Sequence, residues 1–221
     1  MPLKLNYFEK RLARLKVLGY LLQLAPFVKG VILTGSMTTG SSKKGSDIDL
    51  LIITTPKRLY TARLFVTFLT LLTGKKRSVF DKNPAGKFCL NYYLSEDNLD
   101  ILPHDQRCAN FHRYIIRVWD RDGVCEKIYR DNNWLRNYDV KISKEGDVAK
   151  IRATFPIDRW ITFSFLRWPA EALLSTPVGV PLEGLAMSFQ TRKISRSALY
   201  KANESSIIFS EKELRLHPKK F

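Results

Sequence analysis

Two short apolar runs near the N-terminus constrain the fold of this chain most strongly. They cover residues 31–34 and 48–54, both are rich in β-branched side chains, and a polar segment rich in glycine, serine and threonine separates them. Runs of this length and composition are typical of buried strands. They predict two neighbouring strands of one sheet, the second ending before Pro56.

The segments on either side predict helices that pack on this sheet. Residues 59–72 are too long and too apolar for a strand, and Gly74 with the cations at 75–77 is typical of a helix C-terminus. Residues 4–25 place apolar side chains at helical spacing with lysine and arginine between them, which predicts an amphipathic helix with a basic outer face. A third strand is expected at 88–94, after a turn-forming stretch.

The rest of the chain is expected to be mainly helical. Helices are predicted at 105–119 and 183–202, whereas 120–150 shows no clear pattern. We therefore expect an α+β fold with an N-terminal region, 1–145, and a mainly helical, aromatic-rich C-terminal region, 146–221. The boundary is soft and lies near 140–155.

The composition indicates a globular protein in a reducing compartment. Of the residues, 45% are hydrophobic, and the three cysteines, Cys89, Cys108 and Cys125, form no close pair. The N-terminal stretch carries charges throughout, unlike a signal peptide. The longest nearly uncharged stretch, 64–74, has 11 residues, against the roughly 20 that a transmembrane helix needs. We expect a cytoplasmic protein without a transmembrane segment.

The net charge of +16 is unevenly placed. Residues 1–80 hold 14 lysines and arginines but only three acidic residues, so the N-terminal third is the cationic part. A field of this sign attracts nucleic acids and nucleoside triphosphates, and it also attracts anionic membrane surfaces without specificity. A merely solvated basic face is the alternative.

Asp47 and Asp49 are the strongest candidates for a functional site. One residue separates them on a predicted strand, so both carboxylates lie on the same face. Two such charges repel each other unless a divalent cation lies between them, and magnesium binds through one or two carboxylates plus substrate phosphates. Gly35 and Ser36 end the preceding strand, where backbone N–H groups and one hydroxyl can bind an anion.

This segment resembles the DNA polymerase beta-like nucleotidyltransferase superfamily. Gly35-Ser36, a spacer of ten residues and Asp47-Ile48-Asp49 follow an apolar strand, as in the superfamily's signature. The segment is similar to the motif of non-templated terminal nucleotidyltransferases and of small bacterial minimal nucleotidyltransferases. The resemblance spans about 25–95, and the stretches 88–100 and 207–221 resemble an uncharacterised bacterial branch. It implies a small mixed sheet flanked by helices.

The resemblance also implies a reaction. An acceptor hydroxyl attacks the α-phosphate of a nucleoside triphosphate and pyrophosphate leaves, with Mg²⁺ or Mn²⁺ as cofactor. Asp47 and Asp49 would hold the metal and act as catalytic residues, while Gly35 and Ser36 would bind the outer phosphates. Four nearby cations either assist or are solvated loop charges: Lys43, Lys44, Lys57 and Arg58.

Polymerase-type members place a third carboxylate on a later strand. In the matching strand here, 88–94, the central polar residue is Asn91, whose amide offers an oxygen ligand but no charge. Asp81 lies before this strand, and Asp97 lies past its expected end, six residues after Asn91. Either one of these supplies the third ligand, or the activity is weakened or lost.

The sequence leaves three functional alternatives open. The net charge favours an RNA or DNA 3′ end. The second alternative is transfer to a protein side chain or a small molecule, as in toxin–antitoxin pairs, with a partner protein. The third is an inactive protein that binds nucleotides or RNA.

An aromatic stretch in the C-terminal region also allows several interpretations. Trp160, Phe163, Phe165 and Trp168 alternate with arginines and can stack bases, form an oligomer surface or face a membrane. We expect plain core packing, because apolar aromatic side chains usually fill cores.

Overall fold

The computed structural model describes residues 6–78, 81, 83–158, 161–197, 200–201 and 207–216. Its centre is a six-stranded sheet in the order β4-β1-β2-β3-β6-β5. β2 and β3 are parallel and the other neighbours are antiparallel, so the sheet is mixed, as expected. The strands are β1 (Val28–Thr34), β2 (Ile48–Thr54), β3 (Phe88–Ser95), β4 (Ile116–Asp120), β5 (Ile208–Phe209) and β6 (Glu213–Arg215).

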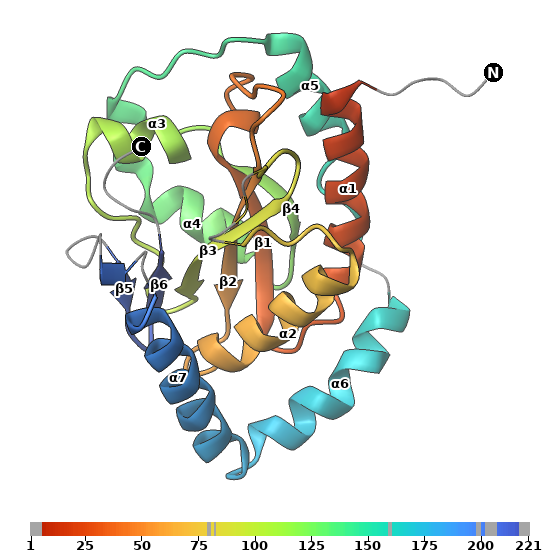
Figure 1. Ribbon diagram of the computed structural model, residues 1–221, viewed down its shortest axis with the longest axis vertical. Coiled ribbons are helices and arrows are strands. Elements are labelled where there is room, and N and C mark those ends of the chain that lie inside the picture. Colours follow the sequence, from red (N-terminus) through yellow and green to blue (C-terminus); the bar gives the residue numbers. More distant parts are fainter. Residues whose placement is uncertain are drawn as a thin grey trace.

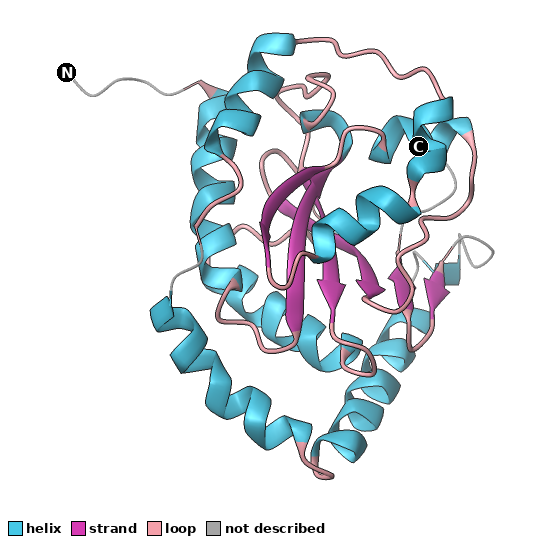
Figure 2. Ribbon diagram, turned by 180° about the vertical axis from the view of Figure 1, so that it is seen from behind, coloured by secondary structure: helices cyan, strands magenta, loops and turns pink. Residues whose placement is uncertain are grey.

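Helices flank both faces of this sheet, which confirms the α+β class (Figures 1 and 2). α1 (Tyr7–Leu22) and α2 (Leu59–Leu72) cover one face, and α4 (Val124–Asp131) covers the other. The remaining elements are α3 (Gln106–His112), α5 (Glu145–Thr154), α6 (Ile161–Ser175), α7 (Gly179–Ser195) and the 3₁₀ turns η1 (Gly35–Met37) and η2 (Asn133–Asn137).

Side chains along β2 alternate between the two faces of the sheet, so this one strand contributes to two hydrophobic clusters. Ile48, Leu50 and Ile52 belong to the cluster under α1 and α2, whereas Leu51 and Ile53 belong to the cluster under α4. Every residue of β2 is buried, which is why its sequence is a continuous apolar run apart from Asp49 and Thr54. A carboxylate at position 49 is thus the exception that requires an explanation.

The helix predicted at 105–119 is wrong in its second half. α3 ends at His112, and Ile116–Asp120 forms β4 instead. β4 pairs with β1, for example Val31 with Trp119, and this long-range pairing buries Val118 and Trp119. Pairing with a distant strand overrides a local helical pattern. The stretch 120–150, which showed no clear pattern, contains α4, η2 and the start of α5.

The C-terminal region contributes strands as well as helices. β6 pairs with β3 through Tyr93 and Leu214, and β5 pairs with β6, so the region 146–221 extends the same sheet. The helix expected at 183–202 is observed as α7, which begins earlier, at Gly179, and ends earlier, at Ser195. The division into 1–145 and 146–221 stays a prediction.

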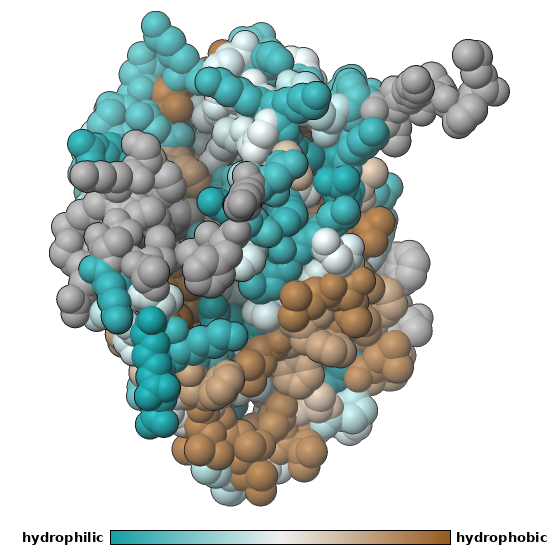
Figure 3. All heavy atoms as spheres, viewed as in Figure 1, coloured by the Kyte–Doolittle hydropathy of each residue, from teal (hydrophilic) through white to brown (hydrophobic). Residues whose placement is uncertain are grey.

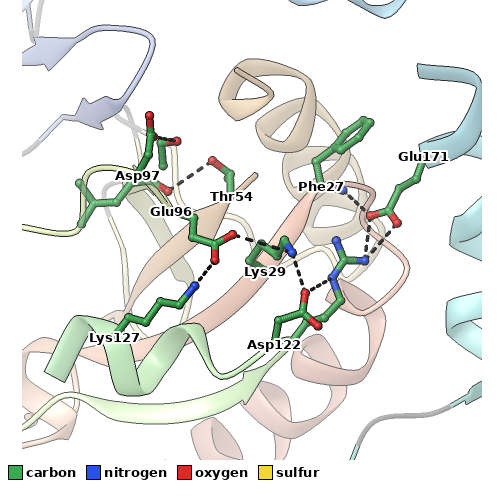
Figure 4. A network of polar contacts seen from close by, with 11 residues as sticks. Phe27, Lys29, Thr54, Glu96, Asp97, Asp122, Lys127 and Glu171 are labelled. Carbon is green, nitrogen blue, oxygen red and sulfur yellow. Dashed lines mark hydrogen bonds and ion pairs between the residues drawn. The ribbon is translucent and has the colours of Figure 1, made fainter. Parts of the chain in front are cut away.

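α6 is attached to the sheet through buried and half-buried charged side chains (Figure 4). The Glu171 carboxylate accepts a hydrogen bond from the Phe27 backbone N–H at 2.8 Å and two from Arg121, at 3.0 and 3.1 Å. Arg167 is buried and donates to the Gln23 carbonyl oxygen at 2.8 Å. These contacts hold α6 against the segment that leads into β1.

The expectation that the aromatic stretch fills the core is wrong for two of its residues. Phe165 is 73% exposed and Trp168 is 68% exposed. Phe163 is half-buried, and Trp160 lies outside the described residues. The reason is that the side of α6 that faces the rest of the molecule carries Arg167 and Glu171, whereas Phe165 and Trp168 lie on the outer side.

Candidate active site

The two predicted carboxylates lie at one end of the central strands. Asp49 is the second residue of β2 and pairs with Thr34 of β1 and with Cys89 of β3. Asp47 lies two residues earlier. Single ligand atoms of Asp47, Asp49 and Cys89 all lie within 4.8 Å of one another. The structure therefore brings the acid pair together where three strands begin or end.

The Gly35-Ser36 turn is in direct contact with this pair. Gly35 opens η1 in the left-handed region, with a φ of +73°, and a Cβ atom there would lie 2.6 Å from Asp49 Oδ2 and 3.0 Å from Phe111. Only glycine combines that backbone conformation with so close an approach. Ser36 follows it and lines the same groove as both carboxylates.

A residue that the sequence did not indicate holds the spacer between the turn and the acid pair. Arg11 of α1 is 2% exposed and donates to Ser42 Oγ at 2.6 Å and to the Lys43 and Lys44 carbonyl oxygens at 2.8 and 2.7 Å. Burial lowers the pKa of its guanidinium. It had counted as one of the basic residues of the helix's outer face, and the only signal is its helical spacing from the apolar residues Phe8 and Leu15.

Burial and repulsion destabilise the charged form of Asp49. Its side chain is 8% exposed, and burial together with the negative charge of Asp47 raises the pKa of Asp49 to about 7. The buried Cys89 thiol donates a hydrogen bond to this carboxylate, which acts in the opposite direction. A positive charge bound beside the pair would remove the repulsion.

Arg77 already supplies part of that charge. Its guanidinium donates to Asp47 Oδ2 and lies 3.8 Å from Cys89 Sγ, while its backbone N–H donates to the Phe88 carbonyl oxygen at 2.9 Å. The sequence analysis assigned the cations 75–77 only to the end of α2. The structure shows that Arg77 also borders the acid pair.

Cys89, not Asn91, lies opposite Asp49. β3 has one more residue than β2 between the pairs Asp49–Cys89 and Leu51–Tyr92, so Asn91 falls in a bulge. Asn91 still lines the groove, and its role as third ligand stays a prediction.

The other two carboxylates lie elsewhere among the described residues. Asp81 pairs with Lys87 at 2.8 Å. Asp97 follows Ser95, which pairs with Thr54 at the opposite end of β2 from the acid pair. Neither belongs to the group formed by Asp47, Asp49 and Cys89.

The donor set fits magnesium. Two carboxylates are hard oxygen donors, and magnesium completes its shell with water and substrate phosphates. Burial, with help from the two carboxylates, raises the pKa of the Cys89 thiol far above its usual range. A sulfur ligand is also softer than the oxygen ligands that magnesium prefers. Asp47 and Asp49 are thus the two residues that would hold a metal ion.

A groove of about 1310 Å³ extends from the acid pair along α2 and α7. Among the described residues that line it, the only carboxylates are Asp47 and Asp49. Burial, and then the charges of Arg63 and Lys193, lower the pKa of Lys76, which shows how closely these cations approach one another. The cations lining the groove are Arg63, Lys76, Arg77, Arg107 and Lys193.

The four cations considered from the sequence do not line this groove. Lys57 and Arg58 follow the opposite end of β2, where Arg58 donates to the Gly179 carbonyl oxygen at 3.0 Å. Lys43 and Lys44 are exposed in the spacer, and their carbonyl groups are held by Arg11.

Comparison with known families now identifies the fold. The family model of the nucleotidyltransferase domain matches residues 15–145, more than half of the chain. The chain belongs to the nucleotidyltransferase domain family. This confirms the resemblance to the polymerase beta-like superfamily. Neither the comparison with curated proteins nor that with solved structures gives a match.

The nucleotidyltransferase domain includes most of the candidate site. The matched residues contain η1, both carboxylates, Arg77 and Cys89. Arg11 precedes them, and α6 and α7 follow them. Family membership therefore supports nucleotidyl transfer in general, while the groove wall formed by α7 lies outside the matched residues.

Proposed function

We propose that this protein is a metal-dependent nucleotidyltransferase that moves a nucleoside monophosphate from a nucleoside triphosphate to an acceptor hydroxyl at an RNA or DNA 3′ end. The observation that carries the proposal is the contact between Gly35 and Asp49 at one end of a groove lined by cations. A phosphate-binding turn and a metal-binding pair in contact are what phosphoryl transfer requires.

Each group in the site has a role in this proposal. The backbone N–H groups at Gly35 and Ser36, with the Ser36 hydroxyl, bind the outer phosphates. Asp47 and Asp49 would hold Mg²⁺ or Mn²⁺, which, when bound, neutralises charge on the triphosphate. Arg77 balances the charge of Asp47 in the free protein and lies close enough to contact an incoming phosphate.

The charge of the groove supports a nucleic acid as the acceptor. Five cations line it, and the described lining residues include no carboxylate outside the acid pair. Such a groove attracts a phosphate backbone and repels cationic small molecules. The proposed partners are therefore a nucleoside triphosphate and a nucleic acid.

One observation favours a second candidate, a protein that binds nucleotides or RNA without catalysis. The position opposite Asp49 holds a thiol, Cys89, and the described residues that line the groove offer no third carboxylate beside Asp47 and Asp49. A site with two carboxylates can hold one metal ion for the triphosphate while lacking a ligand that activates the acceptor hydroxyl.

Incubation with each α-labelled triphosphate, Mg²⁺ or Mn²⁺, and short single-stranded RNA or DNA tests the proposal. We expect labelled, extended nucleic acid that is absent with the Asp47→Asn/Asp49→Asn variant. Asp97→Asn is the matched control, because this carboxylate lies at the other end of β2 and its loss should leave extension unchanged.

The other outcomes separate the alternatives. Label on a protein instead of the nucleic acid would move the acceptor to a protein side chain. Metal-dependent triphosphate binding without any transfer would support the second candidate. Nucleic-acid binding that does not weaken with salt would contradict the role of the cationic groove.

A further inference from the structure

The most unusual surface of the molecule is apolar. Among the described residues, thirteen of the sixteen large apolar side chains that are exposed lie on α2, α6, α7 or the turn between α6 and α7. Figure 3 shows them as a continuous brown area over these helices. We call this area the α2–α6–α7 surface. It comprises Leu64, Phe68, Leu71, Leu72, Phe165, Leu166, Trp168, Leu173, Val178, Val180, Leu182, Leu185 and Phe189.

These side chains are not the edge of the core. On α7, Leu182, Leu185 and Phe189 recur at helical spacing on the outer side, while Ala186 and Ile194 are buried on the inner side. α2 repeats the arrangement, with an exposed stripe opposite its buried residues. Each helix therefore has a second apolar face that the fold does not use. Apolar patches of this extent usually mark an interaction surface.

The carboxylates on these three helices point away from the surface. Glu183 accepts hydrogen bonds from the Tyr60 and Thr61 backbone N–H groups, both at 2.8 Å, and so caps α2. Glu171 accepts from Phe27 and Arg121, as described above. α2 has no acidic residue at all. The α2–α6–α7 surface consequently presents no free negative charge.

Exposed cations lie at the ends of the same helices. Lys57 comes just before α2, and Arg192, Lys193 and Arg196 lie in the last turn of α7 and at its C-cap. An apolar surface bordered by cations and free of carboxylates complements an anionic phospholipid bilayer in both respects. Nucleic acid would leave the aliphatic side chains without a suitable contact.

The helices are arranged to lie in a membrane surface. No described helix is by itself long and apolar enough to cross a bilayer. Residues Phe165–Ser175 and Gly179–Ser195 reach that length and hydropathy only together, and the two segments are bent by 95°. A pair with this bend fits the interface between headgroups and acyl chains, where one tryptophan and several phenylalanines are favourable.

We propose that the α2–α6–α7 surface docks the protein peripherally on an anionic phospholipid bilayer. The apolar residues enter the interface, and the cations at the helix ends contact the headgroups. Leu64 and Phe189 belong both to this surface and to the lining of the cationic groove, so docking places the groove beside the bilayer.

Vesicle flotation of the full chain tests this, with phosphatidylcholine vesicles that contain or lack phosphatidylserine. We expect binding to the vesicles that contain phosphatidylserine and much weaker binding to the others. Phe165→Glu/Trp168→Glu should weaken binding at least about tenfold, because the apolar contact is replaced by charge. Lys57→Gln and Arg192→Gln should each weaken it about fivefold.

The matched control is Val17→Glu/Leu102→Glu, which adds the same two charges at exposed apolar positions outside the surface and should leave binding unchanged. Circular dichroism and the melting temperature show whether each variant is folded. Equal binding by the wild type and the Phe165→Glu/Trp168→Glu variant overturns the proposal. The proposal is also overturned if the wild type does not bind vesicles but sediments as a dimer while the variant sediments as a monomer. The surface is then an interface between copies of the chain. No triphosphate is present, so the result is independent of the proposed enzymatic activity.

Discussion

Asp49 Oδ2 lies 2.6 Å from the point that a Cβ atom on Gly35 would occupy. The Gly35→Ala substitution should therefore displace either the Gly35-Ser36 turn or the carboxylate, and it also forces alanine into the left-handed region, at about 1–2 kcal/mol. We expect a drop of about two orders of magnitude in the rate of transfer, as for other misplaced reacting groups. Gly45→Ala is the matched control, since nothing lies within 4 Å of its added methyl group. Equal rates for the two variants would show that the turn does not position the triphosphate.

The ion pair between Arg77 and Asp47 leads to a prediction about metal binding. Arg77→Ala leaves the acid pair uncompensated, and we expect the free energy of unfolding to fall by about 1 kcal/mol without metal, a modest effect because Arg77 is 40% exposed. Magnesium should restore most of that loss, so it should raise the melting temperature more in the variant than in the wild type. Arg130→Ala removes an exposed ion pair elsewhere and should show no added response to magnesium. Equal responses in both variants would contradict a metal site at Asp47.

Cys89 offers a gain-of-function test. Cys89→Asp places a third carboxylate opposite Asp49 and should destabilise the metal-free protein by several kcal/mol, because a further buried charge is unpaired. Divalent cations should recover that stability and bind more tightly than to the wild type, as calorimetry would measure. Cys125→Asp is the control: this thiol is equally buried and lies beside the Asp120 carboxylate, far from the site. Recovery by metal in both variants, or in neither, would exclude a specific site.

Glu171 makes the stability of the molecule depend on pH. Burial alone would raise its pKa, but the hydrogen bonds from Arg121 and from the Phe27 N–H outweigh burial, and the pKa is lowered (Figure 4). A carboxylate whose folded pKa lies below its unfolded value of about 4.3 stabilises the fold above that pH and loses the effect as the pH falls through the folded pKa. Glu171→Gln should cost about 2 kcal/mol at neutral pH, and the difference from the wild type should shrink below about pH 4. Melting temperatures measured across this range would test it, and a constant difference would contradict it.

The local sequence pattern was sufficient to predict the centre of the fold. β2 and α2 begin and end at the residues expected, because an uninterrupted apolar run and a long apolar segment bounded by Pro56 and Gly74 leave few alternatives. β4 and β6 could not be predicted in this way. They are short, and they become strands only through pairing with β1 and β3, which are distant in the sequence.

The candidate site likewise has a part that local sequence predicted and a part that it did not. The motif of Gly35-Ser36 and Asp47-x-Asp49 is local, and the sequence predicted that its two halves lie on neighbouring strands, where the fold brings Gly35 next to Asp49. Arg11, Arg77 and Cys89 come from three other elements. The bulge in β3 decides that Cys89 rather than Asn91 lies opposite Asp49, and no sequence pattern indicated that bulge.

The hydrogen bonds of Arg11 also have a consequence for motion. They join α1 to a spacer 31–33 residues away, and three carbonyl or hydroxyl oxygens of that spacer share this one guanidinium. If α1 opens, the spacer loses these bonds at the same time, so helix and spacer should unfold and refold as one cooperative unit. Amide hydrogen exchange at Gly40 and Ser46 should then follow the rate at which α1 undocks. The order of the Gly35-Ser36 turn would in that case depend on Arg11, which lies before the residues matched by the family.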